Sequence, residues 1–186
     1  MVFARWRARR ANNDLIEQIH GEIVAAARRP ALYAAFGVAD SFDGRFEMTA
    51  LHAGLAMRRI GAIPGMGADM AQDLADCVFR HFDDALREMG VGDVVMPKRM
   101  KKLAEAFYGR NKAYAEALEA ASPDALALAL ARNVYVAASL DAAPQARGLA
   151  EAARQAADAL RGQRDDDICA GRLAFPALAI PAGAPS

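Results

Sequence analysis

The sequence predicts an all-α protein, a single-domain helical bundle of about six to seven helices. About a quarter of its 186 residues are alanine, the strongest helix former. Apolar residues recur every three to four positions in several long stretches, and no stretch shows the strict alternation of a half-buried strand. The chain is long enough for one domain with a real core, and its 25% of charged residues is typical of folded proteins.

The first half of the chain is expected to form three helices separated by turn-rich loops. Apolar residues at one-face spacing predict a helix over residues 13–29, which a proline then ends. A short helix over residues 31–36 precedes residues 37–44, where glycine, aspartate and serine predict an ordered loop. Helical spacing resumes over residues 46–60, and the glycines and proline of residues 61–67 predict another loop.

The second half is expected to form three long helices and a shorter alanine-rich one. Residues 68–89 give the clearest pattern, because their apolar side chains fall within an arc of about 140° at 100° per residue. A proline suits the first turn of the next helix, over residues 97–120. A Ser-Pro-Asp start signal predicts a helix over residues 123–140, and the alanine-rich helix follows over residues 145–161.

These elements predict three segments in the chain. They are a basic N-terminal arm over residues 1–12, an all-helical domain over residues 13–162, and an extended or disordered tail over residues 163–186. No run of about 18 apolar residues is present, so we expect no transmembrane helix. The formal net charge is zero, so any preference for nucleic acid or membrane must come from local clusters.

The sequence contains no nucleophile elbow, Walker loop or dinucleotide fingerprint, so we expect no catalytic site and no cofactor. Cys77 and Cys169 lie far apart without metal-ligand spacing, so no metal site is expected. His81, Asp83 and Asp84 form a dense titratable cluster. Because arginines stand three and four residues away, we interpret it as a ladder of surface ion pairs. The alternative is a helical-bundle enzyme that uses Asp83 and Asp84.

The helix expected over residues 97–120 has two opposite faces, one apolar and one basic over about 180°. The basic residues are Lys98, Arg99, Lys101, Lys102, Arg110 and Lys112. One interpretation is a docking strip for a polyanion, either ribosomal RNA or an anionic lipid surface. The other is an ordinary lysine-rich outer face. The N-terminal arm, through Arg5 and Arg7 among others, would join the strip as an interfacial anchor, or it is a frayed end without a role.

Short motifs follow one another in a specific order along residues 25–136. They are RRPALY at 28–33, GV at 37–38, DGRF at 43–46, LH at 51–52, LREMGVGD at 86–93, PKRMKK at 97–102 and AFYGR at 106–110. Each motif is weak alone, but their order and spacing resemble the ubiquinol–cytochrome c chaperone family. The chain departs from the family pattern at Ala39 and Ser41, where relatives often carry proline and threonine.

The resemblance implies an all-helical, non-enzymatic chaperone that assists biogenesis of the cytochrome bc1 complex. Mitochondrial relatives bind newly made cytochrome b and work near the ribosomal tunnel exit with a small partner protein. The implied partners are therefore cytochrome b or its nascent chain, the ribosome, a small partner protein and an anionic membrane surface, but not DNA. No mitochondrial targeting segment is evident, which favours a cytoplasmic, bacterial form that is peripheral at the inner membrane.

A client helix of cytochrome b needs an apolar surface until it is inserted, and a groove between helices can offer one. The residues expected to line such a groove are Leu51, His52, Leu55, Phe79, Phe82, Phe107 and Tyr108. The same residues are alternatively ordinary members of the core. A peripheral lipid- or quinone-binding protein is the other function that stays open.

Overall fold

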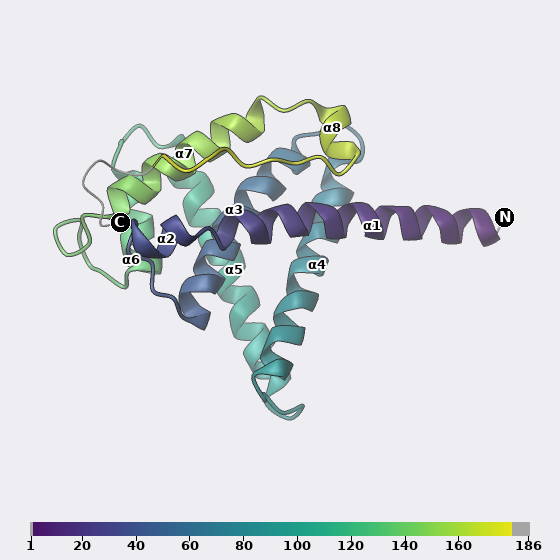
Figure 1. The fold of residues 1–186 in the computed structure, drawn as a ribbon, viewed down its shortest axis with the longest axis horizontal. Coiled ribbons are helices and arrows are strands. Elements are labelled where there is room, and N and C mark those ends of the chain that lie inside the picture. Colours follow the sequence, from purple (N-terminus) through teal and green to yellow (C-terminus); the bar gives the residue numbers. More distant parts are fainter. Residues whose placement is uncertain (1, 180–186) are drawn as a thin grey trace.

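The computed structural model describes the backbone of residues 2–179 and the side chains of residues 12–179. Within this part the protein is helical and has no strand, which confirms the predicted fold class. Figure 1 shows eight helices in the described part: α1 (Val2–Ala27), α2 (Pro30–Ala34), α3 (Phe42–Gly61), α4 (Gly67–Glu88), α5 (Met96–Glu119), α6 (Ala125–Val134), α7 (Ala146–Arg161) and α8 (Asp165–Cys169). Two of them, α2 and α8, have only five residues each.

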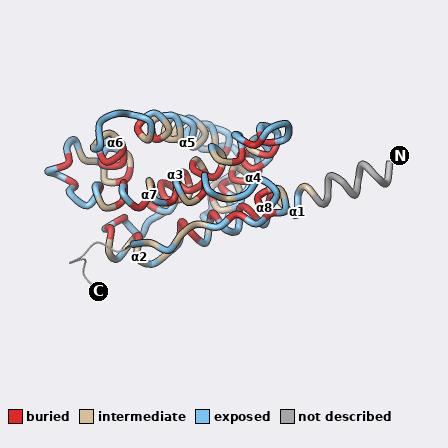
Figure 2. The backbone as a smooth tube through the Cα atoms, turned by 90° about the horizontal axis from the view of Figure 1, so that it is seen from above, coloured by how far each residue is buried: buried red, intermediate tan, exposed pale blue. Residues whose placement is uncertain are grey.

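Helix α3 is the centre of the bundle, since α1, α4, α5, α6 and α7 all pack against it. Its close approach to α5 requires a glycine. A Cβ atom on Gly54 would lie 2.3 Å from Oδ1 of Asn111 on α5. Figure 2 shows buried positions on the sides of the helices that face one another.

The apolar interior divides into two clusters on either side of α3. One cluster joins α2, α3, α6 and α7; its fully buried members include Leu32, Phe36, Leu51, Leu126, Leu130 and Leu149. The other joins α1, α3, α4 and α5; its fully buried members include Ile19, Ile23, Ile60, Leu74, Val78 and Phe107. Each long helix thus buries one apolar stripe, as its sequence period requires.

Helix α1 begins at Val2, whereas the sequence predicted a start near Asn13. The asparagines at this point do not interrupt the helix. Nδ2 of Asn12 donates to Oδ2 of Asp73 on α4 at 2.8 Å, so this amide bonds between helices instead of capping. The side chains of residues 2–11 lie outside the described ones, and the predicted docking role of Arg5 and Arg7 stays a prediction.

Two other helix ends also differ from the prediction. Helix α3 begins four residues earlier than expected, because the side chain of Ser41 accepts a hydrogen bond from N–H of Gly44 and caps the helix. Helix α6 ends at Val134 instead of continuing to residue 140. Val136 has a φ of 52°, and N–H of Ala137 bonds to the carbonyl of Ala131 at 2.9 Å. The chain thus leaves the helix through a left-handed residue, a position that glycine usually occupies.

The described part of the C-terminal segment packs against the helical bundle. The three aspartates at 165–167 form the first turn of α8, where negative charge is favoured. Residues 172–179, here called the C-terminal strap, have no helical structure and run back along α7 (Figure 1). Leu173 is only 1% exposed. Phe175, Pro176 and Leu178 are half-buried and the remaining strap residues are exposed, so the strap packs onto the bundle as an extended segment, and composition alone did not predict this packing.

Candidate functional site

The structure separates the seven predicted groove residues into two places and buries most of them. Leu51, His52 and Leu55 on α3 are 2%, 5% and 5% exposed. Phe82 and Phe107 belong to the core between α4 and α5, while Phe79 is half-buried and Tyr108 is exposed. As a set these residues do not form an open groove, because each apolar stripe packs against a neighbouring helix or against the strap.

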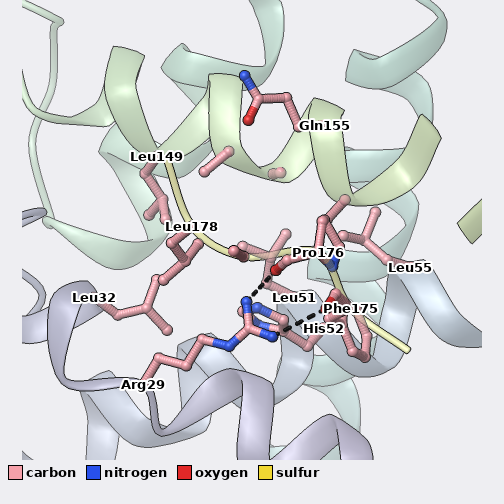
Figure 3. Close-up of a pocket in the computed structure, with 14 residues that line it drawn as sticks. Arg29, Leu32, Leu51, His52, Leu55, Leu149, Gln155, Phe175, Pro176 and Leu178 are labelled. Carbon is pink, nitrogen blue, oxygen red and sulfur yellow. Dashed lines mark hydrogen bonds between the residues drawn. The ribbon is translucent and has the colours of Figure 1, made fainter. Parts of the chain in front are cut away.

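The strap covers the first of these places (Figure 3). Phe175, Pro176 and Leu178 lie over Leu51 and Leu55, in a groove between α2, α3 and α7. Only about 10 Å³ of space remains in this groove, which is about enough for one water molecule. The chain's own C-terminus therefore fills the apolar surface that the sequence analysis assigned to a client.

Hydrogen bonds and one ring contact hold the strap against the helices. The guanidinium of Arg29 donates from Nη2 to the carbonyl of Phe175 at 3.1 Å and from Nη1 to the carbonyl of Pro176. The ring of Phe175 packs edge-on against His52, with centroids 5.1 Å apart. Burial lowers the pKa of His52 to about 4, so the ring is neutral and its Nδ1–H donates to the carbonyl of Met48.

The second place is an aromatic cluster between α4 and α5. Phe79 makes an edge contact with Phe107 at 5.2 Å and a tilted contact with Tyr108 at 5.7 Å between ring centroids. Phe107 is fully buried, whereas Tyr108 is 48% exposed. Only the outer edge of this cluster reaches solvent, so it stabilises the α4–α5 contact and offers a partner little more than Tyr108.

An open cleft that the sequence analysis missed lies between α1, α3 and α4. Its volume is about 950 Å³, at the upper end of the range for ligand sites. Its apolar residues are Val24, Phe42, Phe46, Val78, Phe82, Ala85 and Met89, and its polar residues include Glu17, His20, Arg28, Arg45, His81, Asp84 and Glu88. Phe82 is the one predicted groove residue that borders it. No spacing rule finds this cleft, since its walls come from three separate helices.

The predicted basic strip on α5 is not uniform. Lys98, Arg99 and Lys102 are exposed, and among the described side chains none has a carboxylate within 4.0 Å. Lys101 pairs with Glu105 at 3.8 Å and Lys112 with Glu116 at 3.9 Å, both one turn apart and exposed. Such pairs are weak, so the two lysines keep most of their freedom to bind elsewhere.

Arg110 belongs to the interior rather than to the docking strip. Its Nε donates to both carboxylate oxygens of Glu47 on α3, at 2.7 and 2.6 Å. Glu47 is 5% exposed. Burial raises the pKa of Glu47, and the guanidinium beside it works in the opposite direction. The pair therefore joins α3 to α5, and Arg110 is not free to meet a polyanion.

The tip of the α4–α5 hairpin combines exposed apolar and basic side chains. Met89, Val94 and Val95 are 61%, 96% and 48% exposed. Lys98 and Arg99 follow in the first turn of α5. Figure 1 shows this tip at one extremity of the molecule, away from α7. The free cations of the strip are thus next to apolar residues that no part of the described chain covers.

Asp83 and Asp84 do not converge on an enclosed pocket. Arg87 donates from Nε to Oδ2 of Asp83 at 2.6 Å and from Nη1 to Oδ1 of Asp93 at 2.6 Å. Asp84 is exposed at the rim of the open cleft. Of the ion pairs that the sequence spacing indicated, Asp83–Arg87 is present, whereas Arg80 pairs with Glu17 on α1. Asp83 and Asp84 do not share the enclosed site that the helical-bundle enzyme alternative requires.

An all-helical bundle with an open cleft of mixed apolar and charged residues and a cationic hairpin has the features of a helical binding protein. The chain belongs to the ubiquinol–cytochrome C chaperone family, whose model matches residues 34–175. It is similar to the crystal structure of the Cbp3 homolog from Brucella abortus, with 40% identity over 96% of this chain and 98% of that one and a TM-score of 0.83. No curated protein matches the chain.

The resemblance inferred from residues 25–136 is therefore confirmed, and the family match extends past α8 into the strap. The family's description makes this chain a chaperone connected with the ubiquinol–cytochrome c complex. Among the described residues, no helix has both the length and the apolar character needed to cross a bilayer.

Proposed function

We propose that this protein is a non-enzymatic assembly chaperone that binds newly made cytochrome b and promotes biogenesis of the bc1 complex. The observation that carries the proposal is the family match over residues 34–175. The open cleft between α1, α3 and α4 supplies a physical basis for it. Its exposed Met89 and half-buried Val24, Phe42 and Ala85 offer apolar contacts to an unassembled membrane helix, by helix-in-groove recognition.

The cleft is a better client site than the groove predicted from the sequence. In the predicted groove, the strap already covers Leu51 and Leu55, and the remaining space is about 10 Å³. The open cleft keeps about 950 Å³ free and has Met89 exposed at its edge. Methionine suits such a surface, because its flexible side chain adapts to different client side chains.

A gene-deletion strain tests the proposal. It should lose cytochrome b and bc1 activity while other respiratory enzymes stay at normal levels, and normal bc1 levels would refute the function.

Complementation of this strain then tests the cleft as the client site. Met89→Glu should fail to restore cytochrome b, whereas Met66→Glu should restore it, since Met66 is also exposed, at 52%, but lies outside the cleft. Equal rescue by both variants would remove the cleft as the client site.

We further propose that the α4–α5 hairpin docks the chaperone on an anionic membrane surface. Each basic residue near such a surface contributes about 1 kcal/mol, and exposed apolar residues add burial in the interface. Lys98, Arg99 and Lys102 supply the charges, and Val94 and Val95 supply the apolar part. A ribosomal polyanion would use the cations alone, so the valines favour lipid.

Vesicle flotation tests the docking step. The full chain should float with vesicles that contain anionic lipid and not with purely zwitterionic ones. Lys98→Gln/Lys102→Gln should reduce flotation several-fold, and Val94→Ser, which leaves the net charge unchanged, should also reduce it. The control Arg147→Gln/Arg161→Gln removes the same charge from α7, which packs on α3 and α6. If the control loses as much binding as the α5 variant, attraction is non-specific and the hairpin is not the site.

A further inference from the structure

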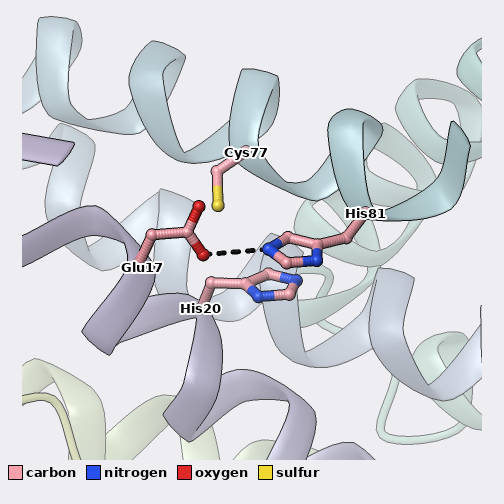
Figure 4. A group of neighbouring side chains, drawn as sticks. All are labelled: Glu17, His20, Cys77 and His81. Carbon is pink, nitrogen blue, oxygen red and sulfur yellow. Dashed lines mark hydrogen bonds and ion pairs between the residues drawn. The ribbon is translucent and has the colours of Figure 1, made fainter. Parts of the chain in front are cut away.

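Four side chains with metal-binding atoms converge between α1 and α4 (Figure 4). They are Glu17 and His20 on α1 and Cys77 and His81 on α4, and one ligand atom from each lies within 4.8 Å of all the others. Spacings of three and four residues place each pair on a single helix face. Because α1 and α4 pack directly against each other, the two faces meet.

The local packing already orders these groups. The rings of His20 and His81 stack in parallel, with centroids 4.1 Å apart and an interplanar angle of 7°. Nε2–H of His81 donates to Oε2 of Glu17 at 2.9 Å. Cys77 is fully buried and His20 is 7% exposed, whereas Glu17 and His81 reach solvent. A metal ion could therefore enter from the open side and meet the buried thiol and imidazole behind.

We propose that Glu17, His20, Cys77 and His81 form a binding site for a zinc-type divalent metal ion that links α1 to α4. One thiolate, two imidazoles and one carboxylate are the donor types that Zn²⁺ takes in four-coordinate protein sites. Hard oxygen-preferring ions such as Mg²⁺ and Ca²⁺ are disfavoured by the sulfur and nitrogen donors. The inference does not depend on the proposed function.

The geometry needs only a small contraction. Zn–N and Zn–S distances of about 2.0–2.3 Å place tetrahedral ligand atoms about 3.3–3.8 Å apart. The present separations of up to 4.8 Å close by rotation of the exposed side chains of Glu17 and His81. Arg80 bonds to Oε1 of Glu17 at 2.8 Å, which leaves Oε2 for the metal.

Metal binding displaces two protons at this site. The ion replaces the proton between Oε2 of Glu17 and Nε2 of His81, and that proton moves to Nδ1 of the same ring. Burial lowers the pKa of His20 to about 4, so this imidazole is already neutral. Burial raises the pKa of the Cys77 thiol to about 11, and the ion's charge displaces the thiol proton to the buffer as the metal–sulfur bond forms.

The proposed metal site lies in the wall of the open cleft. Glu17, His20 and His81 are also wall residues of the open cleft. A bound ion would therefore cross-link two of the three helices that form the cleft and fix the width of one side. The sequence analysis missed this set because Cys77 and Glu17 are sixty residues apart and share no local metal motif.

The experiment titrates the purified full chain, first stripped with a chelator, with Zn²⁺ and separately with Co²⁺. One ion per chain should bind, and Co²⁺ should show a thiolate-to-cobalt charge-transfer band. Cys77→Ser should abolish this band. Since loss of an outer-shell partner already costs about 10–100-fold in affinity, loss of a direct ligand should weaken Zn²⁺ binding by about 100-fold or more. Cys169→Ser is the matched control and should keep both signals.

Because Cys77 is fully buried, its variant is paired with two at partly exposed positions, His81→Gln and Glu17→Gln. Each should weaken Zn²⁺ binding while its circular dichroism stays that of the unaltered chain. Absence of the charge-transfer band in the unaltered chain would overturn the proposal. So would Zn²⁺ affinity that is the same in His81→Gln as in Cys169→Ser, which would indicate binding elsewhere.

Discussion

Two concavities beside α3 differ in whether the chain itself fills them. The groove between α2, α3 and α7 holds the C-terminal strap and keeps about 10 Å³ free, whereas the cleft between α1, α3 and α4 keeps about 950 Å³. Both have leucine, phenylalanine or other apolar residues in their walls. The difference is that the chain supplies an occupant for one and, within its described part, none for the other.

This contrast separates stability from binding. An apolar surface that the chain covers itself belongs to the core and contributes to folding. An apolar surface that stays open gains this stabilisation only when a partner covers it. A rim of charged residues, among them Arg28, Arg45 and Glu88, keeps the open cleft compatible with water.

Removal of the strap should have the largest effect on the closed groove. A chain that ends at Gly171 loses Leu173, Phe175 and Leu178 and exposes Leu51. Since full burial of one such side chain contributes about 1.5–3 kcal/mol, we expect a loss of about 3–5 kcal/mol in the free energy of unfolding. Urea unfolding measures it, with a chain ending at Ala179 as the control. A loss below about 1 kcal/mol would show that packing of the strap contributes little to the stability of the fold.

Acid should destabilise the closed groove through His52. The ring's pKa is about 4 in the folded protein and about 6.5 in an unfolded chain, so the unfolded chain binds more protons between these values. Stability should therefore fall as the pH falls from 6.5 towards 4, by up to about 3 kcal/mol from this group. His52→Gln should flatten the profile of unfolding free energy against pH. An unchanged slope would mean that His52 titrates normally.

Two adjacent arginines allow a direct comparison of the two concavities. Arg29 bonds to strap carbonyls, while Arg28 lines the open cleft. Arg29→Gln should cost about 2 kcal/mol, because hydrogen bonds from charged groups contribute about 1.5–3 kcal/mol. Arg28→Gln should change stability by less than about 0.5 kcal/mol, as surface substitutions do. Equal effects in urea unfolding would contradict the different roles of the two concavities.

The smallest stability effect is expected in the open cleft. Met89 is 61% exposed, so Met89→Glu should change the free energy of unfolding by less than about 0.5 kcal/mol. Leu178→Glu in the strap should destabilise by clearly more, because that side chain packs on the core. Thermal unfolding of the two variants compares them. A strongly destabilised Met89→Glu protein would place Met89 in the core and remove it from the client surface.

Short-range sequence signals predicted helix bounds well where a glycine or a proline stands at the helix end. The bounds of α4 and α5 agree with prediction within one residue, since Gly90 ends one helix and Pro97 fits the first turn of the next. Prediction failed at Ser41, whose capping bond was read as part of a loop, and at Val136, where a β-branched residue takes a left-handed conformation. The packing of the strap against α3 was not predicted, because Phe175 and Leu178 carry no helical or strand period.

The sequence alone determined the all-α fold and the family, because alanine content, helical periods and ordered motifs act over a few residues at a time. Only the tertiary structure decided which concavity is closed, which cations are free and where metal-type ligands meet. Those outcomes depend on contacts between distant parts of the chain. Arg29 meets Phe175 across 146 positions, Arg110 meets Glu47 across 63, and His81 meets Glu17 across 64. No short-range pattern encodes such pairings, since each requires two helices to be packed first.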